Sequence, residues 1–306
     1  MIDMRGKLVF LGTSAGVPTG DRGLASIALQ WKGEVMLLDV GEGAQSNMIK
    51  AGISPMKVTK VFITHLHGDH VLGLPGLLMT MDLLGREDPL SVYGPRGLNA
   101  FLNCLLPTIY EDNVDFPVSS TEIVRPGLVA EGKDYRVSAT RSRHTVESWA
   151  FRFEEKDRPG KFDEEVAKGL GVPPGPLRTT LTKGQSVTVR GRTVKPEDVV
   201  GPPRPGFKIV YTGDTAFSEE VVEFSQGADI LIHEATFESS KIESAEKVLH
   251  ALAADAAKVA SLAGAKRLIL THISARYQNA EPLLEEAKKT FKNTEVAHDL
   301  AEYVID

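Results

Sequence analysis

The sequence has a single cysteine and no long apolar run, and each shortage excludes a class of protein. Cys104 alone cannot form an intrachain disulfide, so any bound metal must be held mainly by imidazole and carboxylate groups. Because Cys104 stands in the apolar run 101–106, we expect a buried thiol. The sequence contains no apolar stretch of about 18 residues and no apolar signal core at its start. These features predict a cytoplasmic protein without membrane insertion.

Positive charge is scarce overall but concentrated in one segment. The formal net charge of −6 argues at first sight against an RNA partner, since phosphate binding needs local positive potential. Residues 168–195, however, carry six basic residues and no acidic one, which leaves −12 on the remainder. The surrounding range 152–207 is rich in proline and glycine and has little helical or strand periodicity. We interpret it as an inserted basic arm for a polyanion, with a solvated linker as the alternative.

Short apolar runs alternate with helical patterns, which predicts an α/β protein. Helical patterns cover 44–51, 71–84, 245–263 and 282–291. Two of the predicted strands end in Thr-His, at His65 and His272, and two others end in Asp, at Asp39 and Asp214. Two related halves would bring these four strand ends together, at the strand edge where α/β proteins place their chemistry.

The run from Thr64 to His70 is the densest group of metal-binding side chains. It follows an apolar strand directly and contains His65, His67, Asp69 and His70. Three imidazoles and a carboxylate on one turn cannot all point into an apolar core without a large desolvation cost. His65 and His67 can hold one ion, and Asp69 and His70 can hold a second. Zinc suits this ligand set, and manganese or iron remain open.

Three later residues complete two ligand sets. His144, Asp214 and His272 each stand at or just after a predicted strand end. With Asp214 as a bridge, the first ion would have His65, His67, His144 and Asp214, and the second Asp69, His70, His272 and Asp214.

This H-x-H-x-D-H motif, with a later His, a Gly-Asp bridge and a final Thr-His, resembles the metallo-β-lactamase superfamily. The resemblance implies a four-layer αββα sandwich of two related halves, which would explain the repeated strand ends. It also implies that Asp39, in Leu38–Gly43, fixes the turn that carries the ligands.

Narrower motifs resemble the ribonuclease Z family and span most of the chain. They are Phe10–Thr13, Gly73–Gly76, Val92–Pro95, Gly171–Leu177, His233–Phe237 and Leu270–Tyr277. The resemblance implies a zinc-dependent endoribonuclease with two Zn²⁺ per chain, or Mn²⁺ in their place. It implies cleavage of the 3′ trailer from precursor tRNA, with a 3′ hydroxyl left on the tRNA. It further implies a homodimer in which one subunit's arm holds tRNA for the other's site.

The same resemblance assigns the remaining residues. His250 matches the family's proton donor, oriented by Glu234, and Asp69 would orient the attacking water. Here Ala251 and Leu252 follow His250 where the family usually has Ser-Thr, so a histidine on an Ala-rich helix is the alternative. In the loop 18–23, Arg22 matches a family position near the RNA 3′ end. The arm would contact tRNA through Lys168, Arg178 and Lys183.

Three other functions fit parts of the pattern. A small-molecule metallohydrolase, such as a phosphodiesterase, lactonase or arylsulfatase, could use the same ligands but would leave the basic arm without a role. Iron-containing redox proteins on this fold usually carry Glu where this chain has His67. A binding module with structural zinc would be expected to have Cys ligands.

Overall fold

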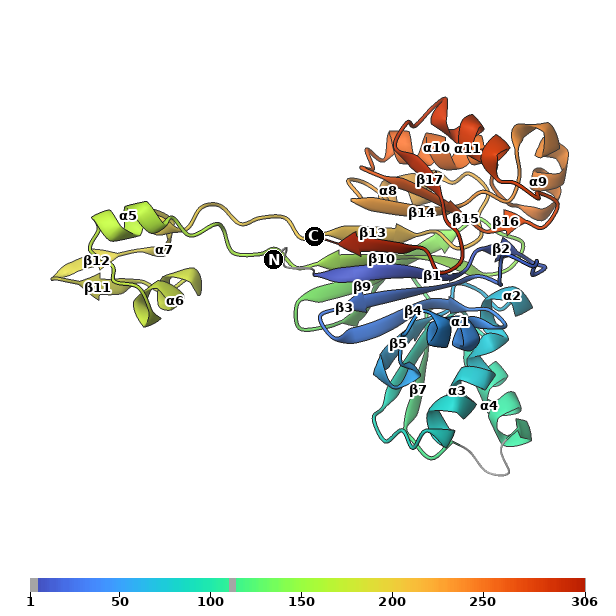
Figure 1. Cartoon of the computed structure of the whole chain (residues 1–306), viewed down its shortest axis with the longest axis horizontal. Coiled ribbons are helices and arrows are strands. Elements are labelled where there is room, and N and C mark those ends of the chain that lie inside the picture. The colour runs from blue at the N-terminus through green and yellow to red at the C-terminus, as the bar shows by residue number, and fades with distance from the viewer. Residues whose placement is uncertain (1–4, 110–113, 306) are drawn as a thin grey trace. The chain divides into compact units, whose positions relative to one another are not determined.

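The computed structural model describes residues 5–109 and 114–305 (Figure 1). The chain divides into two compact units. The larger unit holds residues 1–131, 137–153 and 208–306, and the smaller holds residues 132–136 and 154–207. None of the described helices combines the length and the apolar character needed to cross a bilayer.

The first sheet of the larger unit has seven strands in the order β18-β1-β3-β4-β5-β6-β7. Strands β18, β1, β3 and β4 are antiparallel neighbours, whereas β4 to β7 run parallel. The strands are β1 (Gly6–Gly12), β3 (Ser26–Trp31), β4 (Glu34–Val40), β5 (Val58–Phe62), β6 (Leu90–Gly94), β7 (Val118–Glu122) and β18 (Glu302–Ile305). The segments between β4 and β7 form α1 (Ala44–Lys50), η1 (Pro55–Lys57), α2 (Gly68–Val71), α3 (Gly73–Leu83) and α4 (Leu98–Ile109).

The second sheet also has seven strands, in the order β17-β15-β14-β13-β10-β9-β8, and β13, β14, β15 and β17 run parallel. Its strands are β8 (Gly127–Glu131), β9 (Tyr135–Ser142), β10 (Ser148–Glu155), β13 (Lys208–Tyr211), β14 (Ile230–Glu234), β15 (Leu268–Thr271) and β17 (Thr294–Val296). The helices between its parallel strands are α8 (Glu219–Phe224), η2 (Ser239–Lys241), α9 (Ile242–Val248), α10 (Ala253–Leu262) and α11 (Glu281–Lys288).

The two sheets pack face to face through large side chains. Trp31 meets Phe153 with 4.9 Å between ring centroids, and Phe62 meets Phe151 at 5.4 Å. The apolar faces of α1, α3 and α4 cover the first sheet, and those of α8, α10 and α11 cover the second, as the blue-to-teal and orange-to-red helices in Figure 1 show. The predicted four-layer αββα sandwich is confirmed.

The smaller unit coincides over residues 154–207 with the segment 152–207 that the sequence singled out, and it is folded. It contains α5 (Glu164–Gly169), α6 (Pro176–Thr182), a hairpin of β11 (Val187–Val189) and β12 (Arg192–Val194), and α7 (Pro196–Val199). These short elements enclose a small core that includes Ala167, Val172, Leu181 and Val194. Each element is too short to show a clear period in the sequence, so these helices and strands could not be predicted from it.

Two expectations about local structure need correction. Cys104 is exposed, because it lies on the outer side of α4 while Leu102 and Leu106 enter the core. The helical pattern at 245–263 is two helices, α9 and α10, separated by a break. Leu249 adopts a left-handed conformation there (φ 53°) and ends α9. His250 therefore lies in the break and not on a helix.

Candidate metal centre and active site

The predicted ligands converge at the carboxyl ends of the parallel strands. The turn after β5 carries His65, His67, Asp69 and His70, and the hairpin between β9 and β10 carries His144. Asp214 follows β13, and His272 follows β15. The structure thus brings together all seven residues that the sequence placed around two ions. They form two neighbouring groups.

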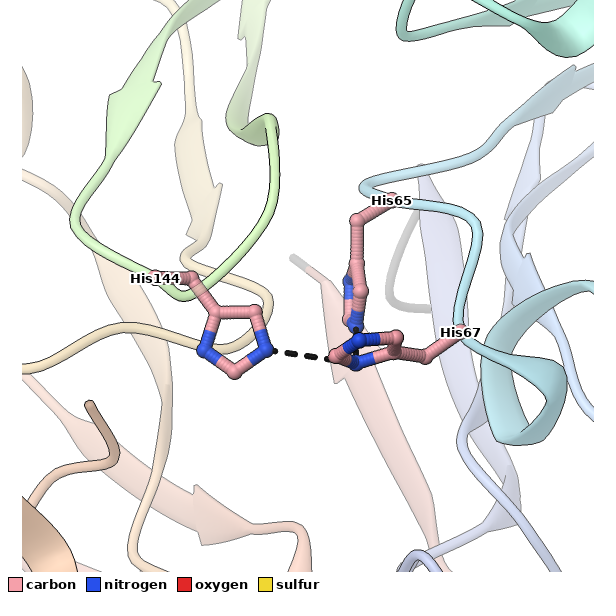
Figure 2. Close-up of side chains that lie close together, drawn as sticks. All are labelled: His65, His67 and His144. Carbon is pink, nitrogen blue, oxygen red and sulfur yellow. Dashed lines mark hydrogen bonds between the residues drawn. The ribbon is translucent and has the colours of Figure 1, made fainter. Parts of the chain in front are cut away.

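The first group consists of three imidazoles (Figure 2). Nδ1 of His67 lies 3.1 Å from Nε2 of His65 and 3.3 Å from Nε2 of His144. In His65 and His144, the second ring nitrogen is already hydrogen-bonded. Nδ1 of His65 donates to the Thr64 hydroxyl, and Nδ1 of His144 donates to the Leu249 carbonyl. The Nε2 atoms of His65 and His144 therefore present their lone pairs to Nδ1 of His67.

The second group has Asp69, His70 and His272. Nε2 of His70 lies 3.3 Å from Nε2 of His272, and Oδ2 of Asp69 lies 3.4 Å from the latter. Asp214 stands between the groups. Its Oδ2 is 3.3 Å from His70 Nε2 and 3.6 Å from His65 Nε2, and its Oδ1 is 3.3 Å from His272 Nε2.

These donor sets fit divalent cations. One ring nitrogen of each of His65, His67 and His144 points to a common place, where three imidazole nitrogens can coordinate one cation once Nδ1 of His67 carries no proton. The Oδ1 atom of Asp214 is buried and has no hydrogen-bond partner within the described residues, which leaves it available for coordination. Neutral imidazole with carboxylate is a ligand set that zinc prefers in hydrolytic sites.

Asp39 organises the ligand turn, as the sequence predicted. It is fully buried and accepts four hydrogen bonds. Its carboxylate accepts from the Thr64 N–H (2.7 Å), the Thr64 hydroxyl (2.8 Å), the Tyr211 hydroxyl (2.8 Å) and Nδ1 of His70 (2.7 Å). The proton on Nδ1 leaves Nε2 of His70 free for a metal.

Two site residues adopt left-handed backbone conformations that only glycine takes at no cost. Asp39 and His272 both have φ of 56°. Such conformations cost about 1 kcal/mol or more and persist where the surrounding structure enforces them. Asp39 lies near the end of β4 and His272 follows β15, and both side chains lie against the His70 ring.

The protonation of the centre reflects burial and close charges. Burial, followed by the charge of His70, lowers the pKa of His65 to about 2. Burial opposes the charge on His70, but the carboxylates of Asp214 and Asp39 raise its pKa well above the ordinary value. Burial opposes ionisation of Asp69, yet hydrogen bonds from His272 and His70 lower its pKa. His70 thus has a carboxylate beside each ring nitrogen, Asp39 at Nδ1 and Asp214 at Nε2.

His250 and Glu234 form a buried pair beside the metal ligands. Nδ1 of His250 lies 2.8 Å from Oε1 of Glu234, and its Nε2 lies 3.9 Å from Oδ2 of Asp214. Burial opposes the positive charge, but the carboxylate of Glu234, followed by that of Asp214, raises the pKa of His250 to about 9. The imidazole can therefore carry a proton near neutral pH and face the centre through Nε2.

The sequence analysis missed Thr236, which links the acid pair to the ligands. Its hydroxyl donates to Oε2 of Glu234 (2.6 Å) and accepts from Nδ1 of His272 (3.0 Å). Thr215 N–H also donates to Glu234, at 2.8 Å. Thr236 belongs to the motif His233–Phe237, which was the signal that could have identified it. Nothing in the sequence marked Thr215.

Two of the proposed RNA-binding residues have structural partners. Arg22 donates to the Thr13 hydroxyl and the Ala297 carbonyl, both at 2.7 Å. Arg178 pairs with Glu164 and donates to the Val172 carbonyl inside the smaller unit. Their contacts with RNA stay predictions. Lys168 and Lys183 are exposed.

Comparison with known proteins gives consistent matches. A model described as "Anti-Pycsar protein Apyc1" matches residues 6–152, and one described as "Beta-lactamase superfamily domain" matches residues 164–273. Ribonuclease Z from Methanothermobacter thermautotrophicus is 48% identical, over 96% of this chain and 95% of its own. Ribonuclease Z from Methanosarcina acetivorans is 43% identical, over 98% of each chain. The crystal structure of human tRNase Z, short form, aligns with a TM-score of 0.73 and 28% identity, over 98% of this chain and 99% of that one.

The sandwich and its convergent imidazole and carboxylate groups define a hydrolase of the metallo-β-lactamase fold. The similarity to the two ribonuclease Z relatives extends over nearly the whole chain and narrows the family assignment further. The chain belongs to the ribonuclease Z family, as the sequence motifs predicted.

Proposed function

We propose that this chain is a metal-dependent endoribonuclease that removes the 3′ trailer from precursor tRNA and leaves a 3′ hydroxyl on the tRNA. The observation that carries the proposal is the position of the His250–Glu234 pair beside two adjoining ligand groups. This arrangement offers water activation by the metal centre and proton donation by His250 at one phosphodiester.

Two divalent cations would occupy the centre, with zinc as the expected metal and manganese as an alternative. His65, His67 and His144 would hold the first, Asp69, His70 and His272 the second, and Asp214 would bridge them. When bound, such cations lower the pKa of a water molecule toward neutrality and neutralise charge on a non-bridging phosphate oxygen.

The protein's own groups supply the remaining steps. Burial opposes ionisation of Asp69, but hydrogen bonds from His272 and His70 hold its pKa below the ordinary value. Its carboxylate can therefore orient the attacking water by accepting a hydrogen bond, while the water gives its proton to solvent. The water oxygen bonds to phosphorus, and the bond from phosphorus to the 3′ oxygen breaks. His250 gives its Nε2 proton to that 3′ oxygen, and Glu234 stabilises the charge on the imidazolium before transfer. The phosphate stays on the trailer.

The smaller unit would bind the tRNA through its exposed basic side chains. Five of its six basic residues between 168 and 195 are exposed: Lys168, Lys183, Arg190, Arg192 and Lys195. The sixth, Arg178, is held by Glu164 and would support the unit's fold more than contact phosphate. The segment 168–195 has no acidic residue to neutralise these exposed cations, which favours a polyanionic ligand.

The active form would be a cytoplasmic homodimer. An apolar stripe on α3 and its neighbour α1 supports this, with side-chain exposure of 53% at Leu72, 80% at Leu83 and 63% at Ile49. Leu72, Met79 and Leu83 recur at a spacing that places them on one helix face. Large exposed apolar side chains on one helix face are typical of a protein interface. Leu83→Glu should convert the dimer to a monomer in analytical ultracentrifugation, and a wild-type monomer would contradict the assignment.

Incubation with a 3′-extended tRNA transcript tests the function directly. The expected products are tRNA with a 3′ hydroxyl after the discriminator nucleotide and a 5′-phosphorylated trailer, formed only with metal present. A chain that turns over a small phosphodiester but leaves this transcript intact would instead support the small-molecule hydrolase.

A further inference from the structure

An arginine near the proposed general acid takes no part in the steps described so far. Arg276 follows the ligand His272 by four residues and is exposed, just after the short strand β16 (Ile273–Ser274). Its Nε donates to the Ser274 hydroxyl (3.0 Å), and its guanidinium carbon lies 4.6 Å from the centroid of the Phe237 ring. These two contacts hold the Arg276 side chain in one orientation. It therefore loses less rotamer freedom when it binds a ligand.

Phe237 brings Arg276 close to the general acid. The Phe237 ring meets the His250 ring edge-on, with 6.2 Å between centroids. Phe237 itself is buried at the end of the strand segment that carries Glu234. The guanidinium of Arg276 and the imidazole of His250 thus contact the same aromatic ring.

The charge on Arg276 is not paired with any carboxylate in residues 5–109 and 114–305. The acids nearest in the fold have other partners, since Glu238 accepts from the Ser240 hydroxyl and Glu286 accepts from two backbone N–H groups. Arg267, in contrast, is paired with a glutamate at 2.6 Å. An exposed, oriented and unpaired guanidinium beside a phosphodiesterase centre has the geometry of a phosphate ligand.

Strand pairing also ties the segment that holds Arg276 to the metal centre. Strand β16 pairs in parallel with β2 (Ser14–Ala15). The next residue, Gly16, donates its N–H to Oδ2 of Asp69 at 2.9 Å. The ligand His272 precedes β16 directly, and the strand paired with β16 leads into the residue that bonds Asp69, so the segment before Arg276 is tied to the metal centre by two routes.

We infer that Arg276 binds a backbone phosphate on the tRNA side of the cleavage point, next to the nucleotide that keeps the 3′ hydroxyl. The inference rests on the proposed function. His250 protonates the 3′ oxygen, which remains with the tRNA, so side chains packed around His250 face that strand. The trailer, which keeps the reacting phosphate, does not need this contact.

The test compares Arg276→Gln with the wild-type enzyme on three RNA ligands. For precursor tRNA, KM should rise about tenfold, as expected for one lost phosphate contact. The inhibition constant of mature tRNA that ends at the discriminator should rise by the same factor. The salt dependence of its binding should flatten by roughly 0.7 to 0.9 in log–log slope. Inhibition by a free 5′-phosphorylated trailer should stay as in the wild type.

Two further variants separate phosphate binding from a structural role. Arg276→Lys keeps the charge and should restore most of the salt slope. Lys289→Gln removes an exposed charge at the end of α11 and should match the wild type in every assay. If Arg276 only supports Phe237, Arg276→Gln should lower the melting temperature and slow a small phosphodiester as much as precursor tRNA, with an unchanged salt slope.

The outcomes distinguish this inference from the proposed function. An unchanged inhibition constant and salt slope for mature tRNA, or a weakened inhibition by the free trailer, would overturn it. If the wild-type enzyme fails to cleave precursor tRNA at all, the proposed function itself is wrong. If the wild type cleaves and Arg276→Gln binds mature tRNA equally well, only the inference on Arg276 fails.

Discussion

Neutralising the exposed cations of the smaller unit tests whether that unit binds tRNA. The variant replaces Lys168, Lys183, Arg190, Arg192 and Lys195 by glutamine and keeps Arg178. This choice preserves the fold, because the five changed side chains are exposed and lie outside the unit's small core. Arg178 is retained because its pairing with Glu164 and its bond to the Val172 carbonyl connect α5 with α6. The substitution is therefore a sharper test than deletion of the whole segment.

The magnitude follows from counterion release. Each phosphate contact on duplex RNA or DNA contributes about 0.9 to the slope of log affinity against log salt concentration. Five lost contacts would flatten the slope by at most about 4.5, and fewer contacts would give a proportionate part of that. Affinity should fall most at low salt, where counterion release contributes most, and the metal content should not change, because no proposed ligand lies in the unit.

Fluorescence anisotropy of labelled tRNA across a salt series measures both quantities. The matched control replaces Thr179, Thr188 and Thr193, which are exposed in the same unit, by glutamine. The control should bind as the wild type does. If the neutralised variant is folded and keeps the wild-type slope and affinity, the smaller unit does not bind RNA, and the tRNA assignment loses its electrostatic support.

Four single substitutions test the metal centre and the acid pair. Asp214→Ala should lose both metals and all activity while remaining folded, because the carboxylate would serve both ions; two metals retained by elemental analysis would contradict the bridge. His250→Ala should keep its metals and slow the single-turnover rate by about 10² to 10⁴. An unchanged rate would assign His250 a structural role only. Glu234→Gln should lower the pKa of His250 from about 9. His250 would then lose its proton at a lower pH, so the alkaline fall of the pH–rate profile should move to lower pH. Asp39→Ala should weaken metal affinity about 10- to 100-fold in a chelator competition, because His70 loses its orienting acceptor. Wild-type affinity would argue against that role.

The sequence alone determined the chemistry of the centre. Imidazole and carboxylate groups on one turn cannot be buried unpaired in an apolar core, so the run from His65 to His70 predicts a metal site before any fold is known. The repeated strand ends at Asp39, Asp214 and His272 likewise predicted that distant segments meet, because parallel strands expose their carboxyl ends at one edge. The family motifs then predicted the four-layer sandwich.

Only the tertiary structure decided features that depend on contacts between distant segments. The sequence pattern at 245–263 fits one helix, yet Leu249 breaks it, since its carbonyl accepts from His144 and the break lets His250 reach Glu234. The smaller unit folds because several short elements share one small core, and no single element carries enough periodicity to reveal it. The pairing of Arg178 and the free charge of Arg276 were equally hidden. A sequence gives the charge of an arginine, but only the packing of the folded chain decides whether a carboxylate lies within reach of it.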